Sequence, residues 1–430
     1  SDPEKNNYDY HWEQYFRDPE NVATTGAWTL ESINGTQGVT LKPNEHHYAA
    51  DQVNFDTIEV VARTSDRANR SALKADSQDY YRGTIPDYIA QSFPDTIEQR
   101  MTPNNGGLSF GFNHRYKLFE NRKARQAIMY AIDRQRIAQS VHRTKYDPVT
   151  VPGGHGYRTA ELVGQDWINS NLTTYERDID KANTLMEEAG FNKEGGKWVD
   201  GEGNVLSIQI PTADTTPTLE PAFANQLSQF GIDASLQTYS QSVFSEKKDG
   251  GEFNIWPGGF GMGFARAVGA IWYYFGRLRM WAENWWRAYP QEQIEEVAWN
   301  NGGRPETNRP STWRPYKIQA PPVGQPNGEL RTYHPAETSM QFMEPRSQET
   351  YREQLKTLAW LYNWYMPLFP VANGQTQHFI DTAHWLWPDT DAPEWDGVGI
   401  DVHQPENVVS FGKFVHANPD NPESGASVDN

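Results

Sequence analysis

The first residues that could do chemistry are 107–111, GLSFG, which fit the G-x-S-x-G pattern of a serine nucleophile. That chemistry needs the serine on a strained turn between a strand and a helix. Ser109 instead lies inside an apolar run that continues to Phe112 and reads as a strand. The 11 His are scattered without an H-E-x-x-H motif, and the chain has no Cys. We therefore expect no catalytic residue, no metal site and no cofactor.

Aromatic residues gather in the segment 252–289, which is the most informative part of the chain. Trp256, Phe260, Trp272 and Tyr273 fall within it, and the whole chain has 16 Trp. An indole ring offers a flat apolar face and one N–H donor, which suits stacking on a sugar ring or on an apolar peptide side chain. The alternative is that any single ring belongs to the core, where aromatic area is commonly buried. We expect at least one of Trp256, Phe260 and Trp272 to face a ligand.

The charge of the chain excludes two classes of partner. The formal net charge is −18, from 56 acidic and 38 basic residues. Nucleic acids and anionic membranes both reward clustered Lys and Arg, so neither is an expected partner. Arg outnumbers Lys, and an acid excess with scarce Lys is typical of salt-adapted, halophilic proteins. Three N-x-S/T sequons make Asn34, Asn69 and Asn171 candidate N-glycosylation sites of a glycoprotein.

The elements that must position these residues read as mixed helices and strands. Residues 119–137 place apolar side chains at i, i+3, i+4, i+7 and i+8, which predicts one helix with Asn121 as its N-cap. Further helical stripes span 179–189, 219–230 and 351–362, and the first two end at a glycine suited to a helix C-terminus, at Gly190 and Gly231.

Two other stretches complete this pattern. Residues 232–236 alternate apolar and polar side chains, as a strand does. Residues 300–345 are rich in Pro, Gly, Asn and Arg without a clear period, and we expect a long surface excursion there.

The sequence of the predicted helix at 125–134, RQAIMYAIDR, is more specific than its apolar periodicity alone. It resembles the motif of the family 5 extracellular solute-binding proteins, the oligopeptide- and dipeptide-binding components of ABC importers. The order and spacing of the resemblance hold from about residue 22 to about residue 415. The other segments that resemble the family are 26–30, 44–48, 55–60, 108–113, 178–191 and 223–236.

The resemblance implies an α/β fold of the periplasmic-binding-protein type, a two-lobe clamshell similar to type II or cluster C. It implies a discontinuous first lobe from 22–115 and 369–418 and a continuous second lobe from 116–368. Residues 1–21 and 419–430 are polar termini. Members of the family normally carry a substantial portion before the segment at 26–30, so we expect the first lobe to be N-terminally incomplete.

By the same resemblance, the segment 253–260 contributes to a ligand cleft. Peptide-binding members carry an Asp that pairs with the peptide's α-ammonium, and this chain has Gly263 at that position. Asn254 and Phe260 also replace the family's usual Asp and Trp. The residues expected to contact ligand are Asn113, Trp256, Gly259, Phe260, Gly261, Trp272 and Tyr273.

The implied function is capture of an extracellular solute by hinge closure and its delivery to a membrane ABC permease. Oligopeptide is the leading solute class. Oligosaccharide is the alternative within the family, because of Gly263 and the Trp content, and a structural or surface-assembly protein is the alternative of another class. The expected location is extracellular or periplasmic, tethered at the cell surface through a segment outside this chain, with a missing N-terminal polypeptide as a further partner.

Overall fold

The computed structural model divides the chain into two compact units. Unit 1 comprises Ser1–Thr102 and Thr376–Asn430, and unit 2 comprises Pro103–Gln375. The chain passes from one unit to the other inside two long strands, β5 (Ile97–Phe112) and β16 (Leu368–Asp381). The residues described are 19, 24–34, 38–63, 65–83, 85–141, 146–155, 157–213, 219–260, 297–298, 312–313, 317–334, 347–389 and 415–418.

The lobe boundaries expected near residues 115 and 368 both lie within unit 2. The boundaries between the compact units fall inside β5 and β16, so that each strand has residues in both units. The expected lobe boundaries lie instead near the end of β5 and the start of β16. The expected assignment of functional lobes stays a prediction.

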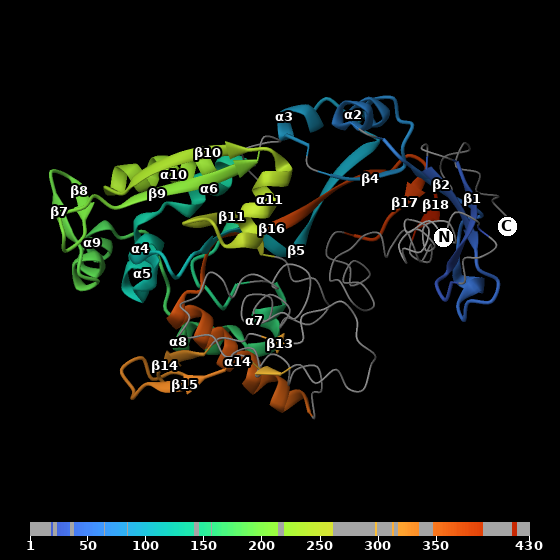
Figure 1. Cartoon of the computed structure of the whole chain (residues 1–430). Coiled ribbons are helices and arrows are strands. Elements are labelled where there is room, and N and C mark those ends of the chain that lie inside the picture. Colours follow the sequence, from blue (N-terminus) through green and yellow to red (C-terminus); the bar gives the residue numbers. More distant parts are fainter. Residues whose placement is uncertain are drawn as a thin grey trace, which may run out of the picture. The chain divides into compact units, whose positions relative to one another are not determined.

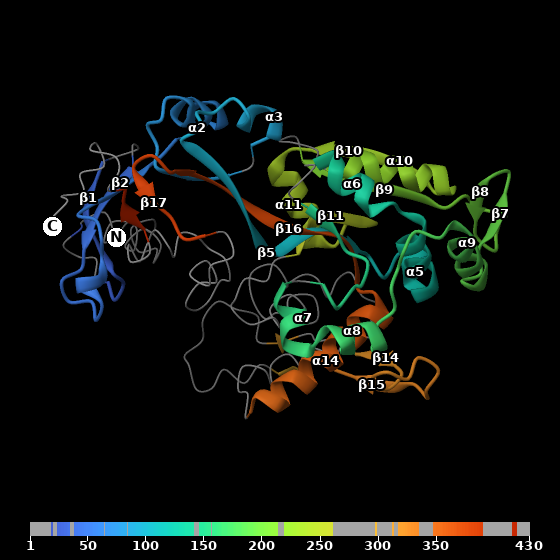
Figure 2. The ribbon, with the colours of Figure 1, turned by 180° about the vertical axis from the view of Figure 1, so that it is seen from behind.

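The larger core of unit 2 lies between helices and two sets of strands. Helix α5 (Arg122–Ala131) packs against α9 (Ile179–Glu188), and α10 (Glu220–Phe230) packs against the parallel strands β9 (Ser207–Ala213) and β10 (Asp233–Tyr239). Figure 1 and Figure 2 both show α10 running along this pair. The helices and the strand predicted over 179–189, 219–230 and 232–236 are therefore confirmed.

The two glycines end their helices as the sequence predicts. Gly190 follows α9 with a φ of 91°, and Gly231 follows α10 with a φ of 108°. Both values lie in the left-handed region, where a residue without Cβ meets no steric penalty.

The single helix predicted over 119–137 is wrong in one respect, because the structure has two helices between the predicted N-cap Asn121 and Ile137. Asn121 caps α5 as predicted, accepting the Lys123 N–H at 2.9 Å. Helix α5 ends at Ala131, Ile132 is extended, and α6 spans Arg134–Val141. The Oδ1 atom of Asp133 accepts the Arg136 N–H at 3.0 Å, so a new N-terminus forms at Asp133. Periodicity misses this break because Ile132 is buried on the same side.

A second core of unit 2 forms around α14 (Gln348–Tyr365), which confirms the helix predicted over 351–362. Helices α7 (Tyr157–Val163) and α8 (Gln165–Asn171) contribute to it, with strand β14 (Ile318–Ala320) and its partner β15 (Arg331–Tyr333). Figure 1 shows this hairpin beside α14.

The surface excursion expected over 300–345 is thus wrong at Ile318–Pro321, whereas the described residues 322–334 are exposed or half-buried. The side chains of Ile318 and Ala320 are buried, and the indole N–H of Trp360 donates to the Pro321 carbonyl at 2.9 Å. Strand β14 has only three residues, of which the first and third are buried. So short an alternation of buried and exposed residues cannot be recognised as a strand from the sequence.

Unit 1 has a small core where α2 (Asp66–Lys74) and α3 (Asp87–Ala90) meet the ends of β5 and β16. Strand β4 (Tyr80–Arg82) pairs antiparallel with β16, from His378 opposite Arg82 to Ile380 opposite Tyr80. Strands β1 (Trp28–Ile33), β2 (Gly38–Pro43) and β3 (Ile58–Val61) form a separate antiparallel sheet. Strand β17 (Trp385–Leu386) pairs with β18 (His416–Ala417).

Short elements complete the chain, and no helix among the described residues has the length and apolar character to cross a bilayer. The remaining elements are η3 (Ala50–Gln52), α4 (Lys117–Glu120), β6 (Tyr146–Pro148), β7 (Asn192–Glu194), β8 (Lys197–Val199), α11 (Gln241–Gly250), β11 (Ile255–Phe260), β12 (Val297–Ala298) and β13 (Thr312–Trp313).

Candidate functional site

The candidate site in unit 2 is strand β11 and the residues that fix it to its neighbours. Strand β11 pairs antiparallel with the end of β5, from Ile255 opposite Phe112 to Phe260 opposite Gly107. Most of the segment predicted to contribute to a ligand cleft, 253–260, is therefore a sheet strand that lies directly beside β5, which ends just before Asn113.

Asn113 joins these two strands through its own amide. Its Nδ2 donates to the carbonyl of Phe253 at 2.6 Å and to that of Gly251 at 3.3 Å. Its Oδ1 accepts the Arg115 N–H at 3.1 Å, and the side chain is buried. Asn113 thus holds the start of β11 against the end of β5, and its predicted contact with a ligand stays a prediction.

Asn254 extends this connection to a third strand. Its backbone carbonyl accepts the Asn113 N–H at 3.0 Å, and its Oδ1 accepts the Gln209 N–H of β9 at 3.0 Å. An aspartate oxygen would accept the same bond. The replacement of the family's Asp therefore changes the charge at this position but keeps the acceptor.

Trp256 is the second residue of β11, and it is only 5% exposed. Its ring lies 3.9 Å from that of Phe244 on α11 and 5.6 Å from that of Phe253, centroid to centroid. These contacts place Trp256 in a packed aromatic cluster. The sequence allows Trp256 a core role as well as a ligand role, but it does not reveal Phe244, whose ring comes from a different element.

The other predicted contacts follow Trp256 along the chain. Gly259 and Phe260 lie in β11, opposite Leu108 and Gly107 of β5. Gly261, Trp272 and Tyr273 lie outside the described residues. The structure thus brings Asn113, Trp256, Gly259 and Phe260 to one pair of strands.

Comparison with known proteins decides the family. Residues 3–280 match the model of the bacterial extracellular solute-binding proteins, family 5, middle region. This chain belongs to that family.

This family 5 protein is similar to a Brucella ovis protein that bears the provisional name of ABC transporter peptide-binding protein. The two chains are 27% identical over 150 residues. That match covers 34% of this chain and only 26% of the relative.

Solved structures show the same fold. NikZ of Campylobacter jejuni, in complex with Ni(L-His), gives a TM-score of 0.59 at 14% identity, covering 84% of this chain and 63% of NikZ. The oligopeptide-binding protein AppA of Bacillus subtilis, in complex with a nonapeptide, gives 0.56 at 12% identity, covering 96% of this chain and 70% of AppA. The predicted α/β fold of the two-lobe periplasmic-binding-protein type is confirmed by these similarities.

The expectation that the family 5 protein is no enzyme agrees with its family, which consists of binding proteins. Ser109 lies within β5, buried and opposite Gly258 of β11, so it does not stand on a strand-to-helix turn. In the part of the chain that the structure describes, no group of three His, Asp or Glu side chains is arranged to hold a metal ion.

A surface cavity of about 400 Å³ lies elsewhere in unit 2 of this family 5 protein, lined by Lys117, Phe191, Asp200 and their neighbours. Two of its charges form an ion pair, in which Lys117 Nζ lies 2.9 Å from Asp200 Oδ2. This hydrogen bond raises the pKa of Lys117 and holds the pKa of Asp200 well below its usual range. The cavity shares no lining residue with the predicted ligand contacts.

The three sequons of the family 5 protein differ in their surroundings. Asn34 is exposed just after β1. Asn69 lies within α2 and is half-buried, and the Asn171 amide donates to the Trp167 carbonyl at 2.8 Å. Glycosylation of all three stays a prediction.

Proposed function

We propose that this family 5 protein binds an extracellular solute, with oligopeptides as the leading class, and delivers it to the membrane permease of an ABC importer. The observation that carries this proposal is the match of residues 3–280 to the family of extracellular solute-binding proteins. The name of the Brucella relative and the nonapeptide in the AppA structure favour a peptide.

The proposed mechanism is hinge closure, in which the solute binds the closed state better and so shifts the population toward it. It is supported by the division into two compact units and by the two strands, β5 and β16, that run from one unit into the other. Strand β5 pairs with β11 and ends one residue before Asn113, whose amide holds the start of β11, so a change in the backbone of β5 would be passed directly to the candidate site.

The proposed location is extracellular or periplasmic. The family is one of extracellular proteins, which supports this location. Tethering at the cell surface is part of the proposal and needs its own test.

The first experiment is native purification followed by release and mass spectrometry of small molecules. A released peptide, confirmed by calorimetric titration with that synthetic peptide, would support the proposal. A released glycan would replace peptide by oligosaccharide, the class favoured by Gly263 at the position of the family's Asp.

Calorimetric titration of the purified chain with tri-alanine, penta-alanine and maltotriose gives the complementary test. Binding of the alanine peptides but not of maltotriose would support peptide capture. If no solute is released and none of these probes binds, the proposal is wrong, and the structural or surface-assembly role takes its place.

Two variants can separate a role of Trp256 in solute binding from its role in core packing. Trp256→Ala and Trp360→Ala each remove a buried indole of unit 2, but only Trp256 lies in β11. If Trp256 stacks on the solute, its loss weakens binding by roughly a few kcal/mol more than the loss of Trp360 does. Equal affinities of the two folded variants would assign Trp256 to the core alone.

A further inference from the structure

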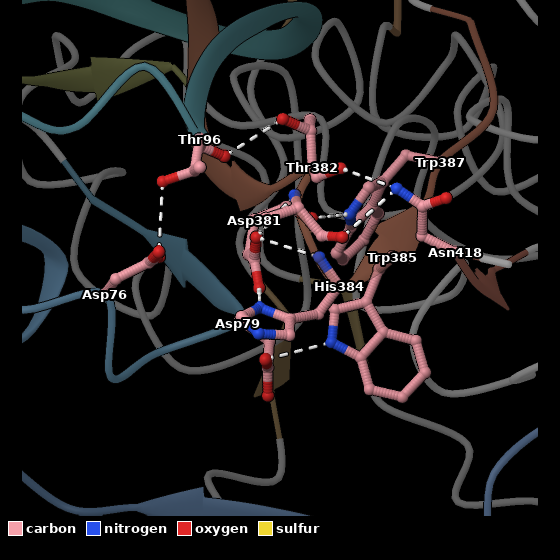
Figure 3. Close-up of polar contacts among 10 residues, drawn as sticks. Asp76, Asp79, Thr96, Asp381, Thr382, His384, Trp385, Trp387 and Asn418 are labelled. Carbon is pink, nitrogen blue, oxygen red and sulfur yellow. Dashed lines mark hydrogen bonds and ion pairs between the residues drawn. The ribbon is translucent and has the colours of Figure 1, made fainter. Parts of the chain in front are cut away.

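In unit 1, the end of β16 carries a buried carboxylate with an unusually full set of donors. Asp381 is 2% exposed. Its Oδ1 accepts the backbone N–H groups of Ala383 at 2.7 Å and His384 at 3.3 Å. Its Oδ2 lies 2.5 Å from Nδ1 of the His384 ring, as Figure 3 shows. The imidazole of His384 thus contacts the Asp381 carboxylate, which lies three residues earlier in the same turn.

Two more carboxylates approach this pair from the segment between α2 and β4. Asp79 accepts the indole N–H of Trp385 at 2.9 Å, and its backbone carbonyl accepts the Asp381 N–H at 2.8 Å. Asp76 accepts the Thr96 hydroxyl at 3.0 Å through Oδ2. Its Oδ1 is buried and has no hydrogen-bond partner among the described residues. The turn thus presents two carboxylates to the pair without a basic side chain of its own to balance them.

The same few residues hold the last described strand of the chain. The Asn418 N–H donates to the His384 carbonyl at 2.8 Å, and its side-chain amide donates to the Ala383 carbonyl at 3.1 Å. The Trp387 indole donates to the Asp381 carbonyl at 2.6 Å. Residues 382–387 therefore connect β18 to the turn at 75–79, and the His384–Asp381 pair lies at the centre of this connection (Figure 3).

The charges that act on the His384 imidazole come from carboxylates. The hydrogen bond to Asp381 raises the pKa of His384 above 6.5, partial burial opposes it, and the charges of Asp381, Asp76 and Asp79 raise it further. On β18 the titratable residue is His416, which pairs with Leu386 in the register. On β5, Arg100 forms an ion pair with Glu98.

We propose that His384 and Asp381 form a proton-dependent clasp that fastens residues 382–387 and β18 to the turn at 75–79. The clasp is tight when the imidazole carries a proton and weaker when it is neutral. A neutral ring still donates from Nδ1 to Asp381, so the contact persists without its charge. The proposal concerns unit 1 alone and does not depend on which solute the protein binds.

The sign of the effect follows from linkage. A group whose pKa is higher in the folded state contributes stability below its unfolded pKa, which for His is about 6.5. That contribution is lost as the pH rises through the folded pKa of His384. The clasp therefore loosens as the pH rises above 6.5 and through the folded pKa of His384.

The first test is titration of the His384 imidazole by NMR in the full-length chain, assigned by comparison with His384→Gln. A pKa above 6.5 supports the clasp, and a pKa at or below 6.5 overturns it.

The second test measures the fastening itself by amide hydrogen exchange of peptides that cover 382–387 and 415–418, corrected for the intrinsic pH dependence. Protection should fall several-fold as the pH rises through the His384 pKa. The change should be absent in His384→Gln and retained in His416→Gln, the matched control on β18. The same pH dependence in His384→Gln as in the parent chain would overturn the proposal.

If His384→Gln does not fold, Asp79→Asn serves in its place, because it keeps an oxygen acceptor for the Trp385 indole and removes one charge. The pH-dependent change in protection should then be smaller than in the parent chain. An unchanged pH dependence would show that these carboxylates do not act on the clasp.

Discussion

The guanidinium of Arg125 donates from Nε to the carbonyl of Met366, 3.0 Å away, at the residue that ends α14. Met366 has a φ of 54°, a left-handed backbone that turns the chain toward β16. The same guanidinium donates to the carbonyls of Tyr365 at 2.7 Å and Phe119 at 2.6 Å. One buried cation of the family motif thus closes the negative ends of two helices, α14 and α4.

Arg125→Ala should lower the free energy of unfolding by roughly 3 kcal/mol or more, because it leaves several buried carbonyls without donors. Arg125→Lys should recover only part of this loss, since a single ammonium does not reproduce the planar fork. Urea denaturation followed by circular dichroism measures both effects. Arg136→Ala, at an exposed position of α6, is the control and should change stability by no more than about 0.5 kcal/mol.

Asn254→Asp should leave stability within about 1 kcal/mol of the parent chain, because the carboxylate still accepts the Gln209 N–H. Asn254→Leu is similar in size but has no acceptor, and it should cost about 1 kcal/mol more than Asn254→Asp. Thermal unfolding of the two variants, side by side, gives the comparison. If both behave alike, the bond between Asn254 and β9 contributes nothing measurable.

His155 should make the protein sensitive to acid. Burial lowers the pKa of His155 from 6.5 to about 3. The unfolded chain therefore takes up a proton near pH 6.5 that the folded chain refuses until about pH 3, so stability falls as the pH drops through this interval.

His155→Gln should reduce that fall, and urea titrations at several pH values across the interval would measure it. His114, whose pKa burial also lowers, keeps its own contribution in this variant. The exposed His46→Gln serves as a control. If the free energy of unfolding falls equally steeply with decreasing pH in His155→Gln and in the parent chain, the prediction is contradicted.

The acidic surface should respond to salt. With a net charge of −18, screening of repulsion between exposed carboxylates should raise the melting temperature as NaCl increases to the molar range. A variant with Glu59, Glu187 and Glu246 changed to Gln, all at exposed positions, should show a shallower rise. A flat or falling melting temperature in the parent chain would count against salt adaptation.

Local sequence predicted those features that short-range physics decides. The apolar stripes of α9 and α10 and the glycines that end them need only residues within a few turns of each other. The family motif at 125–134 likewise identified the correct fold.

The features that sequence missed depend on partners far along the chain. The acceptors of Arg125 on α14 are more than 200 residues away, at Tyr365 and Met366. The sequence is compatible with Trp256 at the ligand or in the core, and the ring that packs against it, Phe244, belongs to another element. The break after Ile132 had a local signal, an Asp at a helix N-cap, which the continuing apolar period concealed.

The division of the chain also sets the order in which the protein can form during synthesis. Unit 2 is complete once Gln375 has left the ribosome, whereas unit 1 needs residues on both sides of it. Strand β4 is made early, but its partner residues His378–Ile380 on β16 arrive almost 300 residues later. Since domains generally fold as units while the chain emerges, we expect unit 2 to fold first and the N-terminal segment to wait. Tyr80–Arg82 of β4 are then made early but are among the last residues to pair.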